Sequence, residues 1–147
     1  MSTEVESRHH ALTILSEEEV MFRDAVAAFA EEEVRPRVHA MDQAAKLDPE
    51  LIPKFFELGL MGIEVPEDLG GAGGSLLMVT LAVEAISRVD ASASIMVDVQ
   101  NTLANYPILR YGTDDQRSRY LPRLTSDTVG AYALSEPGSG SDAFGMA

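Results

Sequence analysis

Apolar residues recur at helical spacing along most of this chain, and that periodicity constrains its fold more than any other feature. Ser16 and Glu19 have the spacing of a capping box, in which side chains and backbone groups satisfy each other at a helix start. The apolar residues that follow at helical spacing are Phe22, Ala25, Val26, Phe29, Ala30, Val34, Val38 and Met41. They predict a helix over residues 16–43. Pro36 should kink this helix or end its first section, because proline lacks an N–H and clashes with the preceding turn.

Further helices are predicted downstream. The run Asp-Pro-Glu at 48–50 is typical of a helix start, and Gly59 suits the C-terminal cap of that helix. Apolar residues nearly encircle the stretch 75–86, which favours burial between neighbours. A largely apolar helix is predicted over 91–109, and a short basic helix with a second capping box over 113–124.

The helix predicted over 91–109 also carries polar side chains. They are Asp98, Gln100, Asn101, Thr102 and Asn105. Because buried polar groups need partners, this face either meets another helix or looks into a cavity. Structural hydrogen bonding is favoured over ligand contact, and both interpretations stay open at this stage.

The connection over residues 60–75 is rich in glycine. The glycines are Gly70, Gly71, Gly73 and Gly74, and Pro66 precedes them. They lack the strand-glycine-helix order of a dinucleotide fingerprint, and no Lys-Ser/Thr pair follows as a phosphate loop requires. We therefore expect a plain flexible connection.

The period changes near the end of the sequence. Residues 129–135 contain β-formers and predict a strand, and the run Ser135-Glu136-Pro137-Gly138 favours a turn that contains the proline and the glycine. A lone strand has no partner for its ladder. The predicted elements, several helices and then one strand, therefore lack a second strand with which the first could pair.

Composition limits the classes of function. The 147 residues suit one domain, and 46% hydrophobic residues are ample for a core. The absence of cysteine excludes disulfides, thiolate zinc sites and a cysteine nucleophile. No metal site is expected on His9, His10 and His39, because no partners recur at ligand spacing.

The net charge of −13 argues against non-specific binding to nucleic acid or to an anionic membrane surface. No apolar run approaches the ~20 residues that a membrane span needs, and residues 1–15 do not resemble a signal or transit peptide. A short stretch nevertheless gathers Arg110, Arg117, Arg119 and Arg123. It is interpreted first as a solvated helix face, and alternatively as a positive patch for an anionic ligand or a neighbouring subunit.

The loop after the predicted strand suits a polar ligand. Gly138 and Gly140 would let backbone N–H groups approach a phosphate or a flavin edge, and neighbouring serines add hydroxyls. Glu136 and Asp142 oppose an anion unless they point away. From pattern alone an ordinary solvated turn is the commoner outcome, and no Ser-His-Asp set or catalytic carboxylate pair is evident.

The run YALSEPGSGSD, from Tyr132 to Asp142, resembles the signature of the acyl-CoA dehydrogenase family. Other family motifs follow the same order in the sequence: Gly59-Leu60-Met61-Gly62-Ile63, Val65-Pro66-Glu67, the glycine loop, Tyr111-Gly112-Thr113 with Gln116, and Tyr120-Leu121-Pro122. The resemblance extends from Leu12 to the C-terminus. The segment Asp98–Leu103 is similar to short/branched-chain members, a weaker indication.

The resemblance implies a mainly α fold. Residues 1–15 would be a flexible leader, 16–126 the N-terminal helical, bundle-like domain, and 127–147 the first strand and start of a middle β-domain. Family members bind FAD, and a carboxylate removes the α-proton of an acyl-CoA while the β-hydride passes to the flavin, giving the 2-enoyl-CoA. An electron-transfer flavoprotein accepts the electrons, and a homotetramer is implied for the full-length protein.

The resemblance also assigns site residues. The cofactor-binding segment would be Tyr132, Ala133, Leu134, Ser135, Glu136, Pro137, Gly138, Ser139, Gly140 and Ser141. Ser141 would contact both FAD and substrate. The acyl-pocket wall would include Met96, Val99, Gln100 and Leu103.

Three departures from the family pattern matter. Ser135 stands where many relatives have threonine and Ser139 where alanine is common, and both remain small. The sequence stops before the family's second flavin motif, most β-strands and the helical bundle that carries the catalytic glutamate. No residue here matches that base, so we expect an N-terminal portion that is inactive alone.

Two alternatives to a dehydrogenase remain open. A related flavin oxidase or monooxygenase would keep the superfamily and change the acceptor or substrate. A non-enzymatic helical interaction module would instead expose apolar surface for a partner. The expected compartment is the bacterial cytoplasm, or the mitochondrial matrix after processing in a eukaryote.

Overall fold

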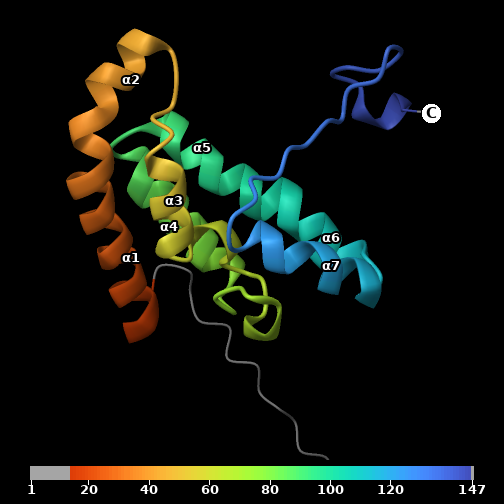
Figure 1. Ribbon diagram of the computed structural model, residues 1–147, viewed down its shortest axis with the longest axis horizontal. Coiled ribbons are helices and arrows are strands. Elements are labelled where there is room, and N and C mark those ends of the chain that lie inside the picture. The colour runs from red at the N-terminus through yellow and green to blue at the C-terminus, as the bar shows by residue number, and fades with distance from the viewer. Residues whose placement is uncertain (1–13, 147) are drawn as a thin grey trace, which may run out of the picture.

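The computed structural model describes residues 14–146, and these residues form a helical assembly with a separate C-terminal segment (Figure 1). Most of the predicted leader, including His9 and His10, lies outside the described residues. The helices are α1 (Glu17–Phe29), α2 (Val38–Ala44), α3 (Leu51–Glu57), α4 (Leu76–Ser87), α5 (Ala91–Val99), α6 (Tyr106–Tyr111) and α7 (Asp114–Leu124).

The first predicted helix forms and changes geometry at its proline. Ser16 accepts the Glu19 backbone N–H at 3.2 Å, and the Glu19 carboxylate accepts the Ser16 N–H at 2.8 Å, so the capping box is confirmed. After α1 the chain passes through a π-helical segment, η1 (Ala30–Val34), and a 3₁₀ turn, η2 (Arg35–Arg37). The predicted break at Pro36 is therefore a local change of helix type between α1 and α2.

The core lies where α1, α3, α4 and α5 meet. Its fully buried side chains include Val26, Val34, Leu51, Phe55, Leu60, Met61, Ile63, Val79, Ile86 and Val97. The rings of Phe29 and Phe55 lie 5.8 Å apart between centroids and join α1 to α3. The predicted burial of α4 between neighbours is confirmed along the side that includes Val79 and Ile86, whereas Leu76 is 58% exposed and Thr80 is also exposed.

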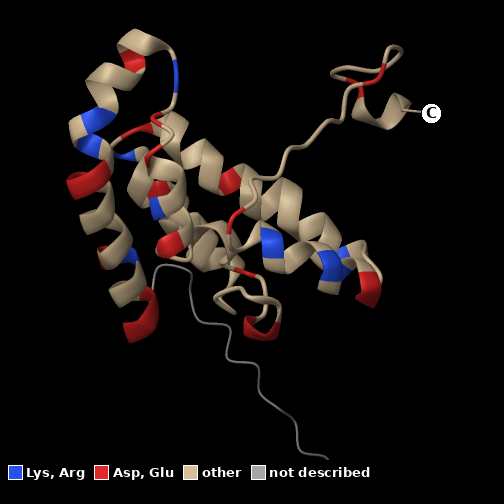
Figure 2. Ribbon diagram, in the orientation of Figure 1, with Lys and Arg blue, Asp and Glu red and all other residues tan. Residues whose placement is uncertain are grey.

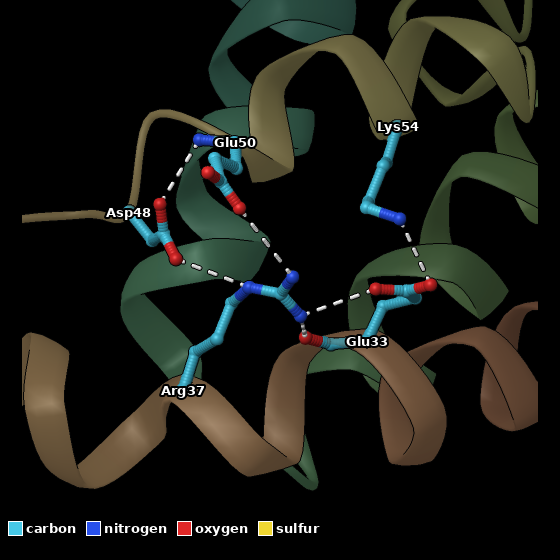
Figure 3. A network of polar contacts seen from close by, with 5 residues as sticks. All are labelled: Glu33, Arg37, Asp48, Glu50 and Lys54. Atoms are coloured by element: carbon cyan, nitrogen blue, oxygen red, sulfur yellow. Dashed lines mark hydrogen bonds and ion pairs between the residues drawn. The ribbon is translucent and has the colours of Figure 1, made fainter.

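A network of charged side chains joins η1 and η2, which follow α1, to the start of α3 (Figure 3). Arg37 donates through Nε to Asp48 at 3.0 Å, and Lys54 Nζ lies 2.9 Å from Glu33 Oε1. Asp48 also accepts the Glu50 backbone N–H at 3.0 Å. The helix itself begins at Leu51, with Glu50 as its N-cap, so the predicted cap at Asp48 stabilises the preceding turn instead.

The connection from Leu60 to Ser75 is not a plain flexible one, which corrects the prediction. Met61 and Ile63 are fully buried, and backbone bonds join Ala72 to Gly62 at 2.9 Å and Gly74 to Ile63 at 2.7 Å. A Cβ built on Gly71 would lie 2.0 Å from the Val65 carbonyl oxygen. The glycines allow two stretches of backbone to press together, and the first stretch, which includes Leu60, Met61 and Ile63, is part of the core.

The predicted strand does not form in the part of the chain that is described. Residues 129–135 run as an extended trace away from α7, and the nearest approach to β structure is an isolated bridge between Glu136 and Ser139 (Figure 1). A strand needs a neighbour to complete its ladder, and none is supplied by the helices.

Candidate functional site

The segment from Tyr132 to Ser141 forms a small open loop beyond the helical part. Glu136 and Ser139 exchange two backbone hydrogen bonds, at 2.9 and 3.1 Å, around Pro137 and Gly138. This confirms a turn with proline and glycine at its centre. Ser139 is the one buried residue of the segment, and its hydroxyl donates to the Asp142 carbonyl.

The rest of the segment is exposed, which suits contact with a large polar group. A Cβ built on Gly138 or Gly140 meets nothing within 4 Å, so the backbone there can be approached closely. Ser135 and Ser141 are exposed and their hydroxyls can donate or accept. These features fit one side of a dinucleotide site, and the segment offers no wall on the opposite side.

Gln100 fixes the point at which this segment leaves the helices. Its Nε2 donates to the carbonyls of Leu124 at 2.6 Å and Thr128 at 3.1 Å, while its Oε1 accepts the Gly130 N–H at 2.7 Å. The side chain is 1% exposed. Sequence reasoning missed Gly130, and its only signal was a glycine at the change of periodicity.

Gln100 begins a π-helical segment, η5 (Gln100–Asn105), which joins α5 to α6. Such wide turns often accompany functional sites. Here the segment carries three buried amide side chains, Gln100, Asn101 and Asn105. The amides hold other parts of the chain: Asn101 accepts the Ile63 N–H at 2.9 Å, and Asn105 donates to the Met61 carbonyl at 2.8 Å. For these residues structural hydrogen bonding is confirmed.

The residues expected at an acyl-pocket wall fall into two groups. Met96 and Val99 are half-buried and Leu103 is 39% exposed, and their spacing places them on one face of the helix. Gln100 differs from these three residues because it is buried and because its amide forms hydrogen bonds with three backbone groups. The Gln100 amide therefore supports the backbone, and the place of this residue in an acyl-pocket wall stays a prediction.

The titratable groups of residues 14–146 form no metal-binding cluster, and one of them, Glu64, has a buried carboxylate oxygen. No group of three or more metal-binding side chains lies together in this range, and His39 is exposed. Burial raises the pKa of the Glu64 carboxyl above its ordinary value, and the Oε2 atom of Glu64 is buried without a hydrogen-bond partner. Glu64 lies between Ile63 and Val65, so it belongs to the buried loop.

The arginine-rich stretch lies on α6 and α7 (Figure 2). Arg110, Arg119 and Arg123 are exposed. Arg117 pairs with Asp114 at 3.2 Å, and Arg119 lies over the Tyr120 ring at 5.3 Å from its centroid. This arrangement fits the solvated helix face that the sequence favoured.

Comparison with known proteins places these features in a larger frame. Residues 16–128 match the family described as "Acyl-CoA dehydrogenase, N-terminal domain". A curated relative from Bos taurus, "Short/branched chain specific acyl-CoA dehydrogenase, mitochondrial", is 42% identical over 135 residues, covering 92% of this chain and 31% of the relative. The chain spans about a third of the length of the curated relatives it matches.

Solved structures share the fold. One, described as "Electron transferring flavoprotein of Acidaminococcus fermentans", superposes with a TM-score of 0.85 at 38% identity, covering 90% of this chain and 35% of that chain. A glutaryl-CoA dehydrogenase from Mycobacterium smegmatis in complex with FADH2 gives a TM-score of 0.82 at 32% identity, covering 90% and 34%. No helix within residues 14–146 is both long and apolar enough to cross a bilayer.

Proposed function

Because this chain belongs to the acyl-CoA dehydrogenase family, we propose that it is the flavin-facing N-terminal part of an enzyme that oxidises short or branched acyl-CoA thioesters to 2-enoyl-CoA. The observation that carries the proposal is the open loop Tyr132–Ser141, which has open space around Gly138 and Gly140 and exposes the hydroxyls of Ser135 and Ser141. The resemblance of the bovine relative supports the short/branched substrate class, and the FADH2 complex of a similar structure supports the cofactor.

Each part of the loop has a proposed role. Backbone groups around Tyr132 and Leu134, with the Ser135 hydroxyl, would face the isoalloxazine ring, and the remaining residues to Gly140 would complete the cofactor contact. Ser141 would lie between FAD and the thioester. FAD, when bound, supplies the acceptor for the β-hydride.

The apolar face of α5 and η5 would hold the acyl chain. Met96, Val99 and Leu103 lie on it, and their partial exposure leaves surface that an acyl chain could cover. Such burial stabilises by about 25 cal/mol for each Å² of apolar surface removed from water. The chain length and branching would depend on the residues opposite this face.

Removal of the α-proton requires a positioned base, and no residue of this chain is proposed for it. The α-proton would pass to a carboxylate outside this sequence as the β-hydride leaves. We therefore propose that the 147-residue chain alone does not oxidise acyl-CoA. An electron-transfer flavoprotein would reoxidise the complete enzyme, which would be a homotetramer in the bacterial cytoplasm or, as the bovine relative's name indicates for that protein, in mitochondria.

Titration of the purified chain with FAD tests the cofactor assignment. Quenching of flavin fluorescence should report binding, and Ser141→Ala and Ser135→Ala should each weaken it about fivefold, since one hydrogen bond contributes about 1 kcal/mol. Ser118→Ala is the matched control, because Ser118 is exposed on α7 and away from the loop. A chain that binds no FAD, or variants that bind as tightly as the parent, would refute the assignment.

Dye reduction with butyryl-CoA and 2-methylbutyryl-CoA tests the proposal that the chain alone does not oxidise acyl-CoA. The chain with added FAD should reduce no acceptor dye in the presence of either thioester. Acyl-CoA-dependent reduction by this chain would show that a base lies within it.

A further inference from the structure

The side chain of Gln100 joins three separate places in the backbone. It reaches the last residue of α7 (Leu124), the following turn (Thr128) and the first residues of the extended segment (Gly130). All three contacts lie 24 to 30 residues further along the chain. A single buried amide therefore connects η5 to the point at which the chain leaves the helices.

Close packing at Gly130 reinforces this connection. A Cβ built on Gly130 would lie 2.4 Å from the Ala104 Cβ and 3.4 Å from the Leu124 Cδ2. The backbone at Gly130 thus passes against η5 more closely than any other residue type allows. We call Gln100, Ala104 and Gly130 together the exit clasp.

Beyond the exit clasp the segment lies open. Residues 131–138 are exposed, whereas Gln100 and Ala104 are buried. The heading of an exposed segment depends on where it is anchored, because its own residues have few packed neighbours to restrain them. The exit clasp supplies such an anchor two residues before Tyr132.

We propose that Gln100 is a positioning residue, which acts through Gly130 to set the direction in which the segment Tyr132–Ser141 leaves the helical domain. The positioning itself stands on the hydrogen bonds and the close packing. Its consequence for the flavin rests on the proposed function. As a positioning residue, Gln100 acts through the backbone at Gly130 and not through contact with the cofactor.

A distance measurement tests the positioning without any cofactor. The chain has no cysteine, so nitroxide labels can be placed at Ser118→Cys on α7 and Ala133→Cys in the segment without background. Double electron–electron resonance should give one narrow distribution of distances between the two labels. Adding Gln100→Leu should broaden it at least twofold, whereas Thr102→Ala should leave it narrow, because the Thr102 hydroxyl bonds only within its own helix.

A second pair of variants keeps the test decisive if Gln100→Leu does not fold. Gly130→Ala should broaden the distribution through collision with Ala104, and the double variant Gly130→Ala/Ala104→Gly should narrow it again. A merely structural role in stability would lower the free energy of unfolding without broadening the distance distribution of the folded chain. A broad distribution in the parent chain, or a narrow one in both Gln100→Leu and Gly130→Ala, would overturn the inference.

FAD titration then separates this inference from the proposed function. Gln100→Leu should weaken FAD binding about tenfold, a change of about 1.4 kcal/mol. If the parent chain binds no FAD, the proposed function fails while the distance measurement still decides the positioning. Unchanged FAD affinity with a broadened distance distribution would remove the link to the cofactor and overturn that part of the inference.

Discussion

The Oδ1 atom of Asn101 accepts the backbone N–H of Ile63 at 2.9 Å, across 38 residues of sequence. The Nδ2 group of the same side chain donates to the carbonyls of Leu60 and Val97, each at 2.8 Å. One side chain on η5 thereby satisfies the backbone of the buried loop that follows α3. This relationship explains how the first stretch of the connection can lie in the core with the Ile63 N–H and the Leu60 carbonyl paired.

Replacing Asn101 with alanine should therefore destabilise the fold. The variant leaves the Ile63 N–H and the Leu60 carbonyl buried without partners, and each unpaired group costs about 1–3 kcal/mol. We expect the free energy of unfolding in urea to fall by about 2–5 kcal/mol. Thr102→Ala, the neighbouring helix position with only local hydrogen bonds, should cost less than about 1.5 kcal/mol. Equal losses in the two variants would contradict the role assigned to Asn101.

Gly71→Ala should be among the most disruptive single-methyl changes. Its Cβ would meet the Val65 carbonyl oxygen at 2.0 Å, so the backbone of the loop must move. Gly138→Ala is the control, because a Cβ there meets nothing within 4 Å. Urea denaturation should give a loss of more than about 3 kcal/mol for the first and within about 0.5 kcal/mol for the second. A tolerated Gly71→Ala would show that the two backbone stretches do not press together.

Truncation of Phe55 tests the junction of α1 and α3. Phe55 is fully buried and its ring meets Phe29. Phe55→Ala should reduce the free energy of unfolding by about 3–5 kcal/mol through lost burial and a cavity. Phe144→Ala, a change of the same size at a fully exposed ring, should alter it by about 0.5 kcal/mol or less. The prediction fails if both variants unfold at the same urea concentration.

Glu64 should make stability fall as pH rises. Burial raises the pKa of its carboxyl in the folded state, so the folded chain keeps this proton over a range in which the unfolded chain has lost it. Stability from this group is complete below the ordinary glutamate pKa and is lost as pH rises through the raised one. Glu64→Gln should gain stability relative to the parent across that window and keep the gain at neutral pH.

Urea denaturation of Glu64→Gln and the parent between pH 3 and 8 measures this difference, with the exposed Glu57→Gln as control. A difference that does not vary with pH, or that varies equally in the control, would contradict the burial of the carboxyl.

Glu33 should have the opposite effect. The Lys54 ammonium, and then Arg37, hold the pKa of the Glu33 carboxyl below its ordinary value. Its stabilising contribution is present above the ordinary pKa and is lost as pH falls through the lowered one. In Lys54→Met the destabilisation relative to the parent should shrink over that acidic window. Thermal melts at several pH values measure the difference in stability between Lys54→Met and the parent, with the exposed Lys46→Met as control. A difference that grows as pH falls would contradict the prediction.

Local chemistry made much of the helical fold predictable. The capping boxes at Ser16 and Thr113 and the left-handed cap at Gly59 depend on residues within three positions of each other. Such signals are complete within the sequence window that contains them. An interruption at Pro36 was predictable for the same reason, whereas its form, a π-helical segment from Ala30 followed by a 3₁₀ turn, was not.

The buried loop and the strand were beyond local reasoning. The loop after α3 owes its order to Asn101 and Asn105, whose contacts lie 38 to 44 residues away. No window around Gly71 contains those partners. A strand over 129–135 requires hydrogen bonds from a neighbour, and β-forming residues alone cannot replace them.

The candidate site is assigned by resemblance, and its sequence pattern alone indicates a ligand only weakly. The turn around Pro137 and Gly138 followed from its residues, whereas a flavin role for the loop remains a prediction drawn from the family. The support given by Gln100 was not anticipated, because an amide on a helix does not show in sequence which backbone groups it will meet.

The wide turn of η5 lets the helix hold one residue more than a regular α-helix without changing the direction of the elements that follow. Each residue advances an α-helix by about 100° around its axis, and a π turn accommodates one residue more than an α turn. Deleting one residue between Gln100 and Asn105 would let the same turn close with regular α geometry, so α6, α7 and the loop beyond them would keep nearly the same direction. Deleting one residue from the regular helix α5 would instead rotate everything beyond it by about 100° around the axis.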